Sequence, residues 1–291
     1  MQAGRTARWL AGLATLAGLL AAAPGTAAAD PVSPAAADIA RAETTSATNG
    51  TSPKSVTVNC PAGTRVYSAA GRINGGVGSV VLDDVTPNDG LTSVLVTAYE
   101  TAPDESWSLT GYATCGSTVQ NLQRVFIASE SNSDSPKSFL VTCPGSTRLY
   151  GLGAEITGGL GNVVLDDLTP NAGLTGVTVT AYENGAYAPN WRLTGYAICG
   201  NAATTMQLNT SSNPGGLVAL DPVSPKGVTT PACPAGTKVH GAGGTITGGI
   251  GGVSLDDVTP NVGLGTVTAT GYTIPGSAPN WRITAYAICA S

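Results

Sequence analysis

The sequence from Cys143 to Cys199 opens with Cys143-Pro144-Gly145-Ser146-Thr147, continues through Val163-Val164-Leu165-Asp166-Asp167-Leu168-Thr169-Pro170-Asn171, and closes with Trp191-Arg192-Leu193-Thr194-Gly195-Tyr196-Ala197-Ile198-Cys199. The same order of features recurs from Cys60 to Cys115 and from Cys233 to Cys289. A period of this size is typical of repeat proteins. The chain of 291 residues is therefore predicted to contain three copies of one unit.

Apolar residues alternate with polar ones inside each copy. In the stretch 175–182, Val177 and Val179 point one way, while Thr178, Thr180 and Tyr182 point the other. This period of two indicates half-buried strands, and glycines and Thr-Pro-Asn turns separate them. Five strands are expected in each copy, and only the N-terminal segment has the apolar content of a helix.

We therefore expect an all-β fold of three tandem, disulfide-closed, antiparallel, sandwich-like repeats. The alternative is a single β-prism in which each repeat supplies one sheet around a pseudo-threefold axis. The two arrangements differ in where they place Trp107, Trp191 and Trp281. Separate sandwiches would keep each tryptophan in its own core, whereas a prism would bring the three together.

The six cysteines fall as one pair in each repeat. Six cysteines allow fifteen pairings, and the repeat symmetry selects one link inside each copy. The predicted disulfides are Cys60 to Cys115, Cys143 to Cys199, and Cys233 to Cys289. Such links are typical of proteins that fold in an oxidising compartment.

Residues 1–29 resemble a secretory signal peptide. Arg5 and Arg8 precede an apolar core from Leu10 to Ala23, and Ala27-Ala28-Ala29 offers a cleavage site. Residues 30–51 are expected to form a flexible leader because they are rich in Ala, Ser and Thr. The repeats are then placed at 52–122, 123–205 and 206–291. The protein is predicted to be secreted, with no membrane span in the mature chain.

The charge balance limits the partners. Only 11% of the residues are charged and the formal net charge is −5, so nucleic acid would be repelled. No phosphate-binding loop, zinc-ligand spacing or other cofactor motif is present in the sequence. No cofactor is expected.

An Asp-Asp-x-Thr-Pro-Asn motif occurs once in each repeat. Its acidic and amide residues are Asp83, Asp84 and Asn88; Asp166, Asp167 and Asn171; and Asp256, Asp257 and Asn261. Proline and asparagine are typical of turns, so a structural turn is the favoured interpretation. A calcium loop is the alternative, and it would need six or more oxygen ligands. Neighbouring residues on a strand face opposite ways, so each aspartate pair is expected to be split between two faces.

The sequence does not predict an enzyme. His240 aligns with Tyr67 and Tyr150, which favours a surface or packing role over general-base catalysis. No nucleophile elbow or metal triad is present, and the prominent residues all occur three times. The alternative is a carbohydrate-active enzyme that uses carboxylates from different repeats, with Glu155 or Glu183 as the unique acidic residue.

Tyrosines and arginines on the threonine-bearing face are the candidate binding residues. They are Tyr99, Tyr112, Tyr182, Tyr196, Tyr272, Tyr286, Arg192 and Arg282. If the face is exposed, these side chains could stack on and hydrogen-bond a sugar or a peptide. The favoured alternative is that a second sheet covers the face. The predicted function is a secreted, non-catalytic repeat protein, either structural or binding an extracellular or cell-wall glycan or protein.

The frame from Cys-Pro-Ala-Gly-Thr to Trp-x-x-Thr-x-Tyr-Ala-x-Cys resembles that of uncharacterised secreted β-repeat proteins of actinobacteria. The resemblance covers nearly all of the predicted mature chain and implies no particular activity. The chain is also similar to vitelline membrane outer layer protein I, whose three repeats combine Cys-Pro-x-Gly with an Asp-Asp motif. That similarity implies a β-prism and a carbohydrate-related function.

Overall fold

The computed structural model describes residues 39–102 and 106–291. The predicted signal peptide and residues 30–38 of the predicted leader lie outside the described residues. All the regular elements in the described part are β-strands, in agreement with the predicted all-β class. None of its elements is a helix with the length and apolar character needed to cross a membrane.

Each repeat supplies six strands. The first repeat contains β1 (Ala40–Thr45), β2 (Lys54–Asn59), β3 (Arg65–Asn74), β4 (Val80–Pro87), β5 (Ser93–Glu100) and β6 (Ser108–Gly116). The second contains β7 (Gln123–Ala128), β8 (Lys137–Thr142), β9 (Arg148–Thr157), β10 (Val163–Pro170), β11 (Gly176–Glu183) and β12 (Arg192–Gly200). The third contains β13 (Met206–Asn213), β14 (Lys226–Thr229), β15 (Lys238–Gly248), β16 (Val253–Pro260), β17 (Val267–Thr273) and β18 (Trp281–Ala290).

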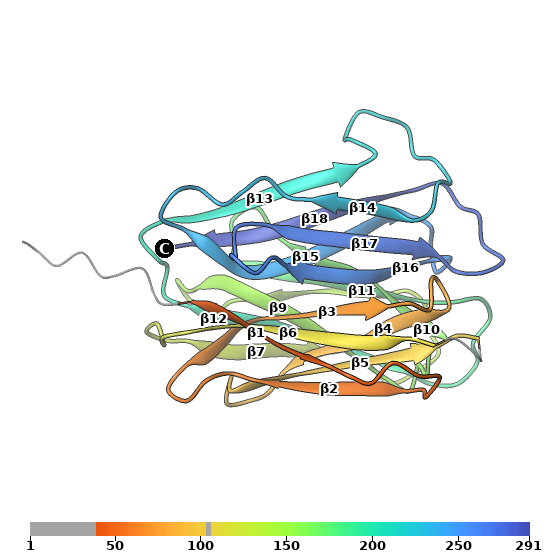
Figure 1. Ribbon diagram of the computed structural model, residues 1–291, viewed down its shortest axis with the longest axis horizontal. Helices are drawn as coiled ribbons and strands as arrows, with labels where there is room; N and C mark the ends of the chain where they lie inside the picture. The colour runs from red at the N-terminus through yellow and green to blue at the C-terminus, as the bar shows by residue number, and fades with distance from the viewer. Residues whose placement is uncertain (1–38, 103–105) are drawn as a thin grey trace, which may run out of the picture. The chain divides into compact units, whose positions relative to one another are not determined.

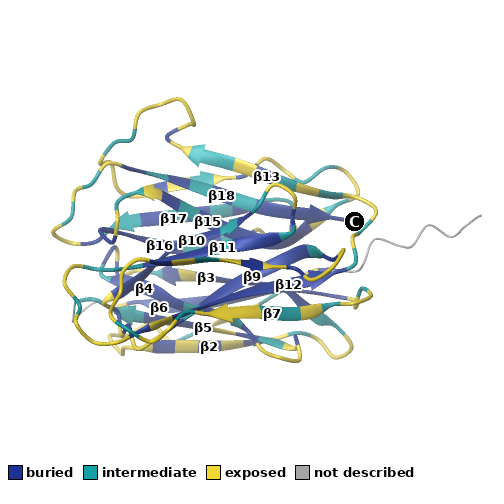
Figure 2. Cartoon of the chain, turned by 180° about the vertical axis from the view of Figure 1, so that it is seen from behind, coloured by how far each residue is buried: buried dark blue, intermediate teal, exposed yellow. Residues whose placement is uncertain are grey.

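The first strand of each repeat, β1, β7 or β13, is the one that the periodicity did not predict. The expectation of a flexible leader is wrong from residue 40 onward, because β1 pairs with β6 from Ala40↔Cys115 to Thr45↔Thr110. These strands lie at sheet edges, where β1 and β7 are largely exposed and β13 is mostly half-buried, so a regular apolar alternation is not required of them. Figure 2 shows β7 and β13 at such edges. Their backbone hydrogen bonds, and not a hydrophobic stripe, hold them in place.

Three six-stranded sheets form, and each is shared by two repeats (Figure 1). Their strand orders are β1-β6-β3-β16-β17-β14, β2-β5-β4-β9-β12-β7, and β13-β18-β15-β10-β11-β8. The repeats meet where β3 pairs with β16, β4 with β9, and β10 with β15. The repeats are therefore interlocked and do not form three separate sandwiches. The arrangement corresponds to the closed alternative, except that each sheet is built from halves of two repeats.

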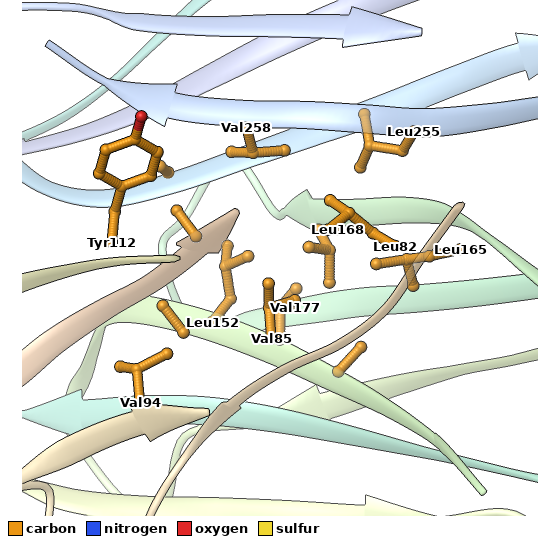
Figure 3. Close-up of a cluster of buried hydrophobic side chains, with 14 of the residues drawn as sticks. Leu82, Val85, Val94, Tyr112, Leu152, Leu165, Leu168, Val177, Leu255 and Val258 are labelled. Atoms are coloured by element: carbon orange, nitrogen blue, oxygen red, sulfur yellow. The ribbon is translucent and has the colours of Figure 1, made fainter. Parts of the chain in front are cut away.

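One main apolar core joins all three repeats. Equivalent leucines from β4, β10 and β16 point into it, namely Leu82, Leu165 and Leu255 (Figure 3). Central strands such as β9 and β12 are buried along most of their length. Burial on this scale gives the dominant favourable term in folding.

The centre of the molecule is formed by β3, β9 and β15, which contact one another. A β-bulge in each strand leaves Tyr67, Tyr150 or His240 as an extra residue. Such bulges re-aim a side chain, and here the three rings meet with centroids 5.1 to 5.5 Å apart. Gly151 makes the approach possible, since a Cβ there would lie 1.7 Å from the carbonyl oxygen of Tyr67.

The packing role predicted for His240 is confirmed, because the side chain is 2% exposed and packs against both tyrosines. The three tryptophans, by contrast, do not come together at the axis, as they were expected to do in a prism. Each packs inside its own repeat under a lysine of that repeat. The aromatic residues that come together from the three repeats are therefore the two tyrosines and the histidine, and not the tryptophans.

The three predicted disulfides are confirmed: Cys60 to Cys115, Cys143 to Cys199, and Cys233 to Cys289. Each joins the segment after the second strand of a repeat to the last strand. The bond closes the repeat even though the two strands belong to different sheets. Each disulfide therefore ties two sheets together.

Candidate functional site

The aspartate pairs lie where two repeats meet in a sheet. In β4 the pairing with β5 passes from Leu82↔Ala98 to Asp84↔Thr97, which leaves Asp83 as the extra residue of a bulge. The same irregularity occurs in β10 and β16. Because of the bulge, both carboxyls of a pair lie close enough to share a hydrogen bond. The expectation that neighbouring aspartates face opposite ways is therefore wrong here.

The second aspartate of each pair links two repeats. Asp84 Oδ1 accepts a hydrogen bond from the backbone N–H of Ile156 at 3.2 Å, and Asp257 Oδ1 accepts one from Ile73 at 3.0 Å. Asp167 lies beside the corresponding N–H group, that of Ile246, but its Oδ1 has no hydrogen-bond partner among the described residues. These contacts run from repeat 1 to repeat 2, from 2 to 3, and from 3 back to 1. They supplement a backbone pairing that is short at each junction.

Burial changes the protonation of these carboxyls. Asp83, Asp166 and Asp256 are each 3% exposed, and their Oδ1 atoms find no partner among the described residues. Desolvation, followed by the charge of the neighbouring aspartate, raises the pKa of Asp83 and of Asp166 to about 9. Desolvation also raises the pKa of Asp84 to about 6. In every pair, burial therefore makes both carboxyls harder to ionise than in water.

The asparagines of the motif have the predicted turn role. Asn88 Oδ1 accepts the backbone N–H of Thr92 at 2.7 Å, and Asn171 Oδ1 accepts that of Thr175 at 2.8 Å. In the third repeat, Asn261 Oδ1 accepts the N–H of Gly265 at 2.7 Å. Over residues 39–102 and 106–291, no group of three or more His, Cys, Asp or Glu side chains is arranged to hold a metal ion.

The candidate tyrosines are grouped across repeats and not within them. Tyr99 shares a sheet with Tyr196, Tyr182 with Tyr286, and Tyr272 with Tyr112. One tyrosine of each pair therefore comes from each of the two repeats that build the sheet. Tyr99 lies near Asp83 and Asp84, whose charges, together with desolvation as the larger cause, raise its pKa.

The tyrosines differ in how far they are covered. Tyr112 and Tyr196 are each 5% exposed, whereas the other four are half-buried. Among the described residues, the cover of Tyr112 and Tyr196 is not the second sheet that the favoured alternative proposed. Instead an arginine of the edge strand lies over the ring, Arg41 over Tyr112 and Arg124 over Tyr196, each 4.8 Å from the centroid. Each of these arginines also donates to the carbonyl of a Thr-Pro-Asn turn.

The sheet that contains β13 lacks this cover. Leu208 pairs with Ile288 at the position where Arg124 pairs with Ile198 in the other sheet. An open pocket of about 520 Å³ lies there, lined among others by Leu208 and Arg148. Tyr286 is consequently half-buried, and no arginine of residues 39–102 and 106–291 lies over its ring as one does over Tyr112 and Tyr196. Of the three equivalent tyrosines Tyr112, Tyr196 and Tyr286, the last is the one that is not fully buried.

One residue distinguishes the three aspartate sites. It belongs to the neighbouring repeat and lies opposite the second aspartate of the pair. This residue is Glu155 at the first site, Thr245 at the second and Arg72 at the third. Glu155 Oε2 accepts a hydrogen bond from the hydroxyl of Tyr196 at 2.5 Å, and its charge helps raise the pKa values of Asp83 and Asp84. Carboxylates of two repeats therefore converge at the first site.

The two candidate arginines lie at the starts of β12 and β18. Arg192 is exposed and pairs in register with Thr157. Arg282 pairs with Thr247 and donates to the carbonyl of Val218 at 2.6 Å. The structure does not place either arginine against an aspartate pair.

The lysines of the Ser-Pro-Lys segments are structural residues whose role the sequence did not reveal. Lys54, Lys137 and Lys226 are nearly buried, with Nζ 4.2 to 4.5 Å from the ring centroids of Trp107, Trp191 and Trp281, respectively. Cation–π contacts of this kind are strengthened by desolvation. The sequence feature that could have indicated this structural role is the occurrence of the Ser-Pro-Lys segment once in each repeat, where a strand begins.

No family model matches the sequence, and no curated protein matches it either. The resemblances drawn from the repeated motifs therefore stay predictions.

Proposed function

We propose that this protein is an exported, non-catalytic module that binds extracellular glycans through the outer faces of its sheets. The observation that carries the proposal is a combination repeated on every sheet: a half-exposed tyrosine beside a buried pair of aspartates. The ring of each tyrosine can stack on a sugar and its hydroxyl can hydrogen-bond it, which suits an uncharged, hydroxyl-rich ligand.

The face built from β13, β18, β15, β10, β11 and β8 is the proposed main site. Two half-buried tyrosines, Tyr182 and Tyr286, lie on this sheet, and no arginine covers Tyr286. The other two faces keep one half-buried tyrosine each, Tyr99 and Tyr272. Three weak sites on one chain would raise the avidity for a polymeric ligand without a deep pocket.

Glycan arrays and pull-down on cell-wall polysaccharides test this proposal. The double change Tyr182→Ala with Tyr286→Ala should reduce binding by about ten-fold, the effect of losing a stacking contact. Val262→Ala is the control, because Val262 is an exposed apolar residue in the turn between β16 and β17 and not on a tyrosine-bearing face. A wild-type protein that binds no glycan would contradict the proposal and favour a structural role.

Leu208→Arg is a second test of the same site. It introduces the residue that covers the tyrosine in the other two sheets, so it should reduce binding while leaving the melting temperature unchanged or higher. Unchanged binding would exclude the face next to β13 as the main site.

Export is part of the proposal. It is supported by the three disulfides, since such bonds persist in oxidising compartments. Mass spectrometry of the protein recovered from the culture medium should find a chain that begins at Asp30. Recovery of the intact chain only inside the cell would contradict export.

A carbohydrate-active enzyme is the second candidate, and one observation favours it. Asp83, Asp84 and Glu155 come from two repeats and meet at a single site, and the first two have pKa values of about 9 and about 6. Carboxyls with separated pKa values can act as acid and base. Turnover of an oligosaccharide that is abolished by Glu155→Gln, but not by Glu183→Gln, would establish catalysis.

A further inference from the structure

Three equivalent loops each expose one bulky aliphatic side chain. Val77 follows β3, Leu160 follows β9 and Ile250 follows β15, and they are 66%, 61% and 76% exposed. Glycines flank each of them. Leu160 and Ile250 have φ angles of 49° and 30°, in the left-handed region that branched residues rarely adopt. Asparagine or glycine would fit these turns with less strain, so folding does not explain the aliphatic side chains.

The three loops lie at the same end of the sheets. Val81 and Val164, which follow the loops of Val77 and Leu160, form one small apolar cluster with Ile274, whose N–H donates to the carbonyl of Gly252 beside the loop of Ile250. Each loop also contacts the repeat next to it; for example, a Cβ on Gly161 would lie 3.1 Å from Tyr99 Cβ. This arrangement places Val77, Leu160 and Ile250 around one axis.

A longer loop of the third repeat adds to the same end. Leu217 and Val218 are 105% and 58% exposed in the connection between β13 and β14. The loop is held there by the hydrogen bond from Arg282 to the carbonyl of Val218 at 2.6 Å. Val77, Leu160, Ile250, Leu217 and Val218 together form what we call the apolar end.

Arginines occur in the strands next to the bases of two of the three loops. Arg192 pairs with Thr157, just before the loop of Leu160, and Arg282 pairs with Thr247, just before the loop of Ile250. Neither guanidinium has a carboxylate partner in the described part of the chain. The first repeat has Ser108 at this position. The loop residues between strands at these three tips carry no charge.

We propose that the apolar end inserts into the surface of a zwitterionic phospholipid bilayer. The aliphatic side chains would enter the boundary between headgroups and acyl chains, and Arg192 and Arg282 would meet the lipid phosphates. The shape favours lipid over a second copy of the chain. Protein interfaces need flat or complementary surfaces, whereas single side chains raised on glycine loops leave gaps that only a fluid surface fills.

Co-sedimentation with phosphatidylcholine vesicles tests the proposal. The wild-type protein should bind, and the triple change Val77→Asn, Leu160→Asn and Ile250→Asn should lower the partition coefficient by about ten-fold or more. Asparagine tolerates the left-handed region, so the variant should keep its melting temperature. The matched control changes three exposed aliphatic residues elsewhere, Leu95→Thr, Leu140→Thr and Val262→Thr, and should bind like the wild type.

A second variant isolates the phosphate contact of Arg192. Arg192→Gln should also weaken binding to the vesicles, by a smaller factor than the triple change, whereas Arg282 is kept because it also holds the loop at Val218. The proposal is overturned if the wild type does not sediment with the vesicles, or if the asparagine variant binds equally well. It is also overturned if the wild type is a dimer in solution that the asparagine variant converts to a monomer, since a second copy would then occupy the apolar end.

Discussion

At the residue scale, the indole N–H groups of the three tryptophans meet different partners. Trp107 donates to Glu100 at 2.6 Å and Trp191 donates to Glu183 at 2.9 Å. The equivalent of these glutamates in the third repeat is Thr273, and Trp281 Nε1 finds no acceptor among the described residues. A buried donor without an acceptor costs free energy.

We expect Thr273→Glu to stabilise the protein. The new carboxylate would accept the Trp281 N–H, which is worth about 1 kcal/mol, or a rise of about 2–4 °C in melting temperature. Differential scanning calorimetry measures the change. Thr273→Met, of similar length but without an acceptor oxygen, is the control and should give no gain. Equal gains from both variants would show that packing, and not the hydrogen bond, is responsible.

The buried carboxyls of Asp83 and Asp166 should make stability fall with rising pH. Their native pKa, about 9, lies above the unfolded value of 3.8, so the native state holds more protons between these limits. Their contribution to stability is therefore complete below pH 3.8 and is lost as the pH rises toward 9. His240 acts in a lower window, because burial lowers its pKa to about 4 and its contribution is lost only as the pH falls from 6.5 to 4.

Melting temperatures between pH 7 and 9 check this prediction. The wild-type value should decline across this range, and Asp83→Asn with Asp166→Asn should decline less, since an amide can still donate to the neighbouring carboxylate without titrating. Glu130→Gln, an exposed site, serves as the control and should follow the wild type. A decline of the same slope in the double variant would contradict the assignment.

At the scale of the elements, the weakest points of the sheets are the junctions between repeats. Between β4 and β9 the backbone register is limited to Val85↔Ala154. Side chains extend it, since Asp84 accepts from Ile156 and Thr86 Oγ1 donates to the carbonyl of Ala154 at 3.2 Å. The bulge that re-aims Asp84 thus helps to join one repeat to the next.

Asp84→Ala should loosen this junction locally. Loss of one acceptor is worth about 1 kcal/mol, so the amide of Ile156 should exchange its hydrogen about five-fold faster. Asp84→Asn keeps an oxygen at the same position and should leave the exchange nearly unchanged. The amide of Ile73, bonded to Asp257, is the internal reference. Equal exchange rates at Ile156 in the alanine and asparagine variants would contradict the proposed role of this oxygen.

At the scale of the whole molecule, the shared sheets make the repeats dependent on one another. A single repeat, such as residues 123–205, would lose the partner of β9 in one sheet and the partner of β10 in another. It would also expose core side chains such as Leu168. The chain from residue 39 onward should behave as one folding unit.

We expect the excised repeat 123–205 to be unfolded even with its disulfide formed, because small units bury too little apolar surface alone. The full chain should show one calorimetric transition whose van't Hoff and calorimetric enthalpies agree. NMR spectra of the excised repeat should lack chemical-shift dispersion. A folded spectrum would mean that the junctions contribute little to stability.

The sequence alone determined the local features of this protein. The period of two at Val177, Val179 and Ala181 predicted strands, and the regular spacing of the cysteines predicted the three disulfides that the structure contains. The alignment of His240 with Tyr67 and Tyr150 predicted its packing role. Each of these features depends on residues that are close in the chain or repeated at one period, so a pattern records them.

Only the tertiary structure decided which repeats share a sheet, and with it the composition of each site. Pairing of β4 with β9 rests on backbone groups that every residue carries, so no residue type marks it. The bulge at Asp83 reverses a side-chain direction that strict alternation would assign, and so places two carboxyls together. Tyr99 then shares a sheet with Tyr196 of another repeat, because the packing of the whole core decides which strand edges pair.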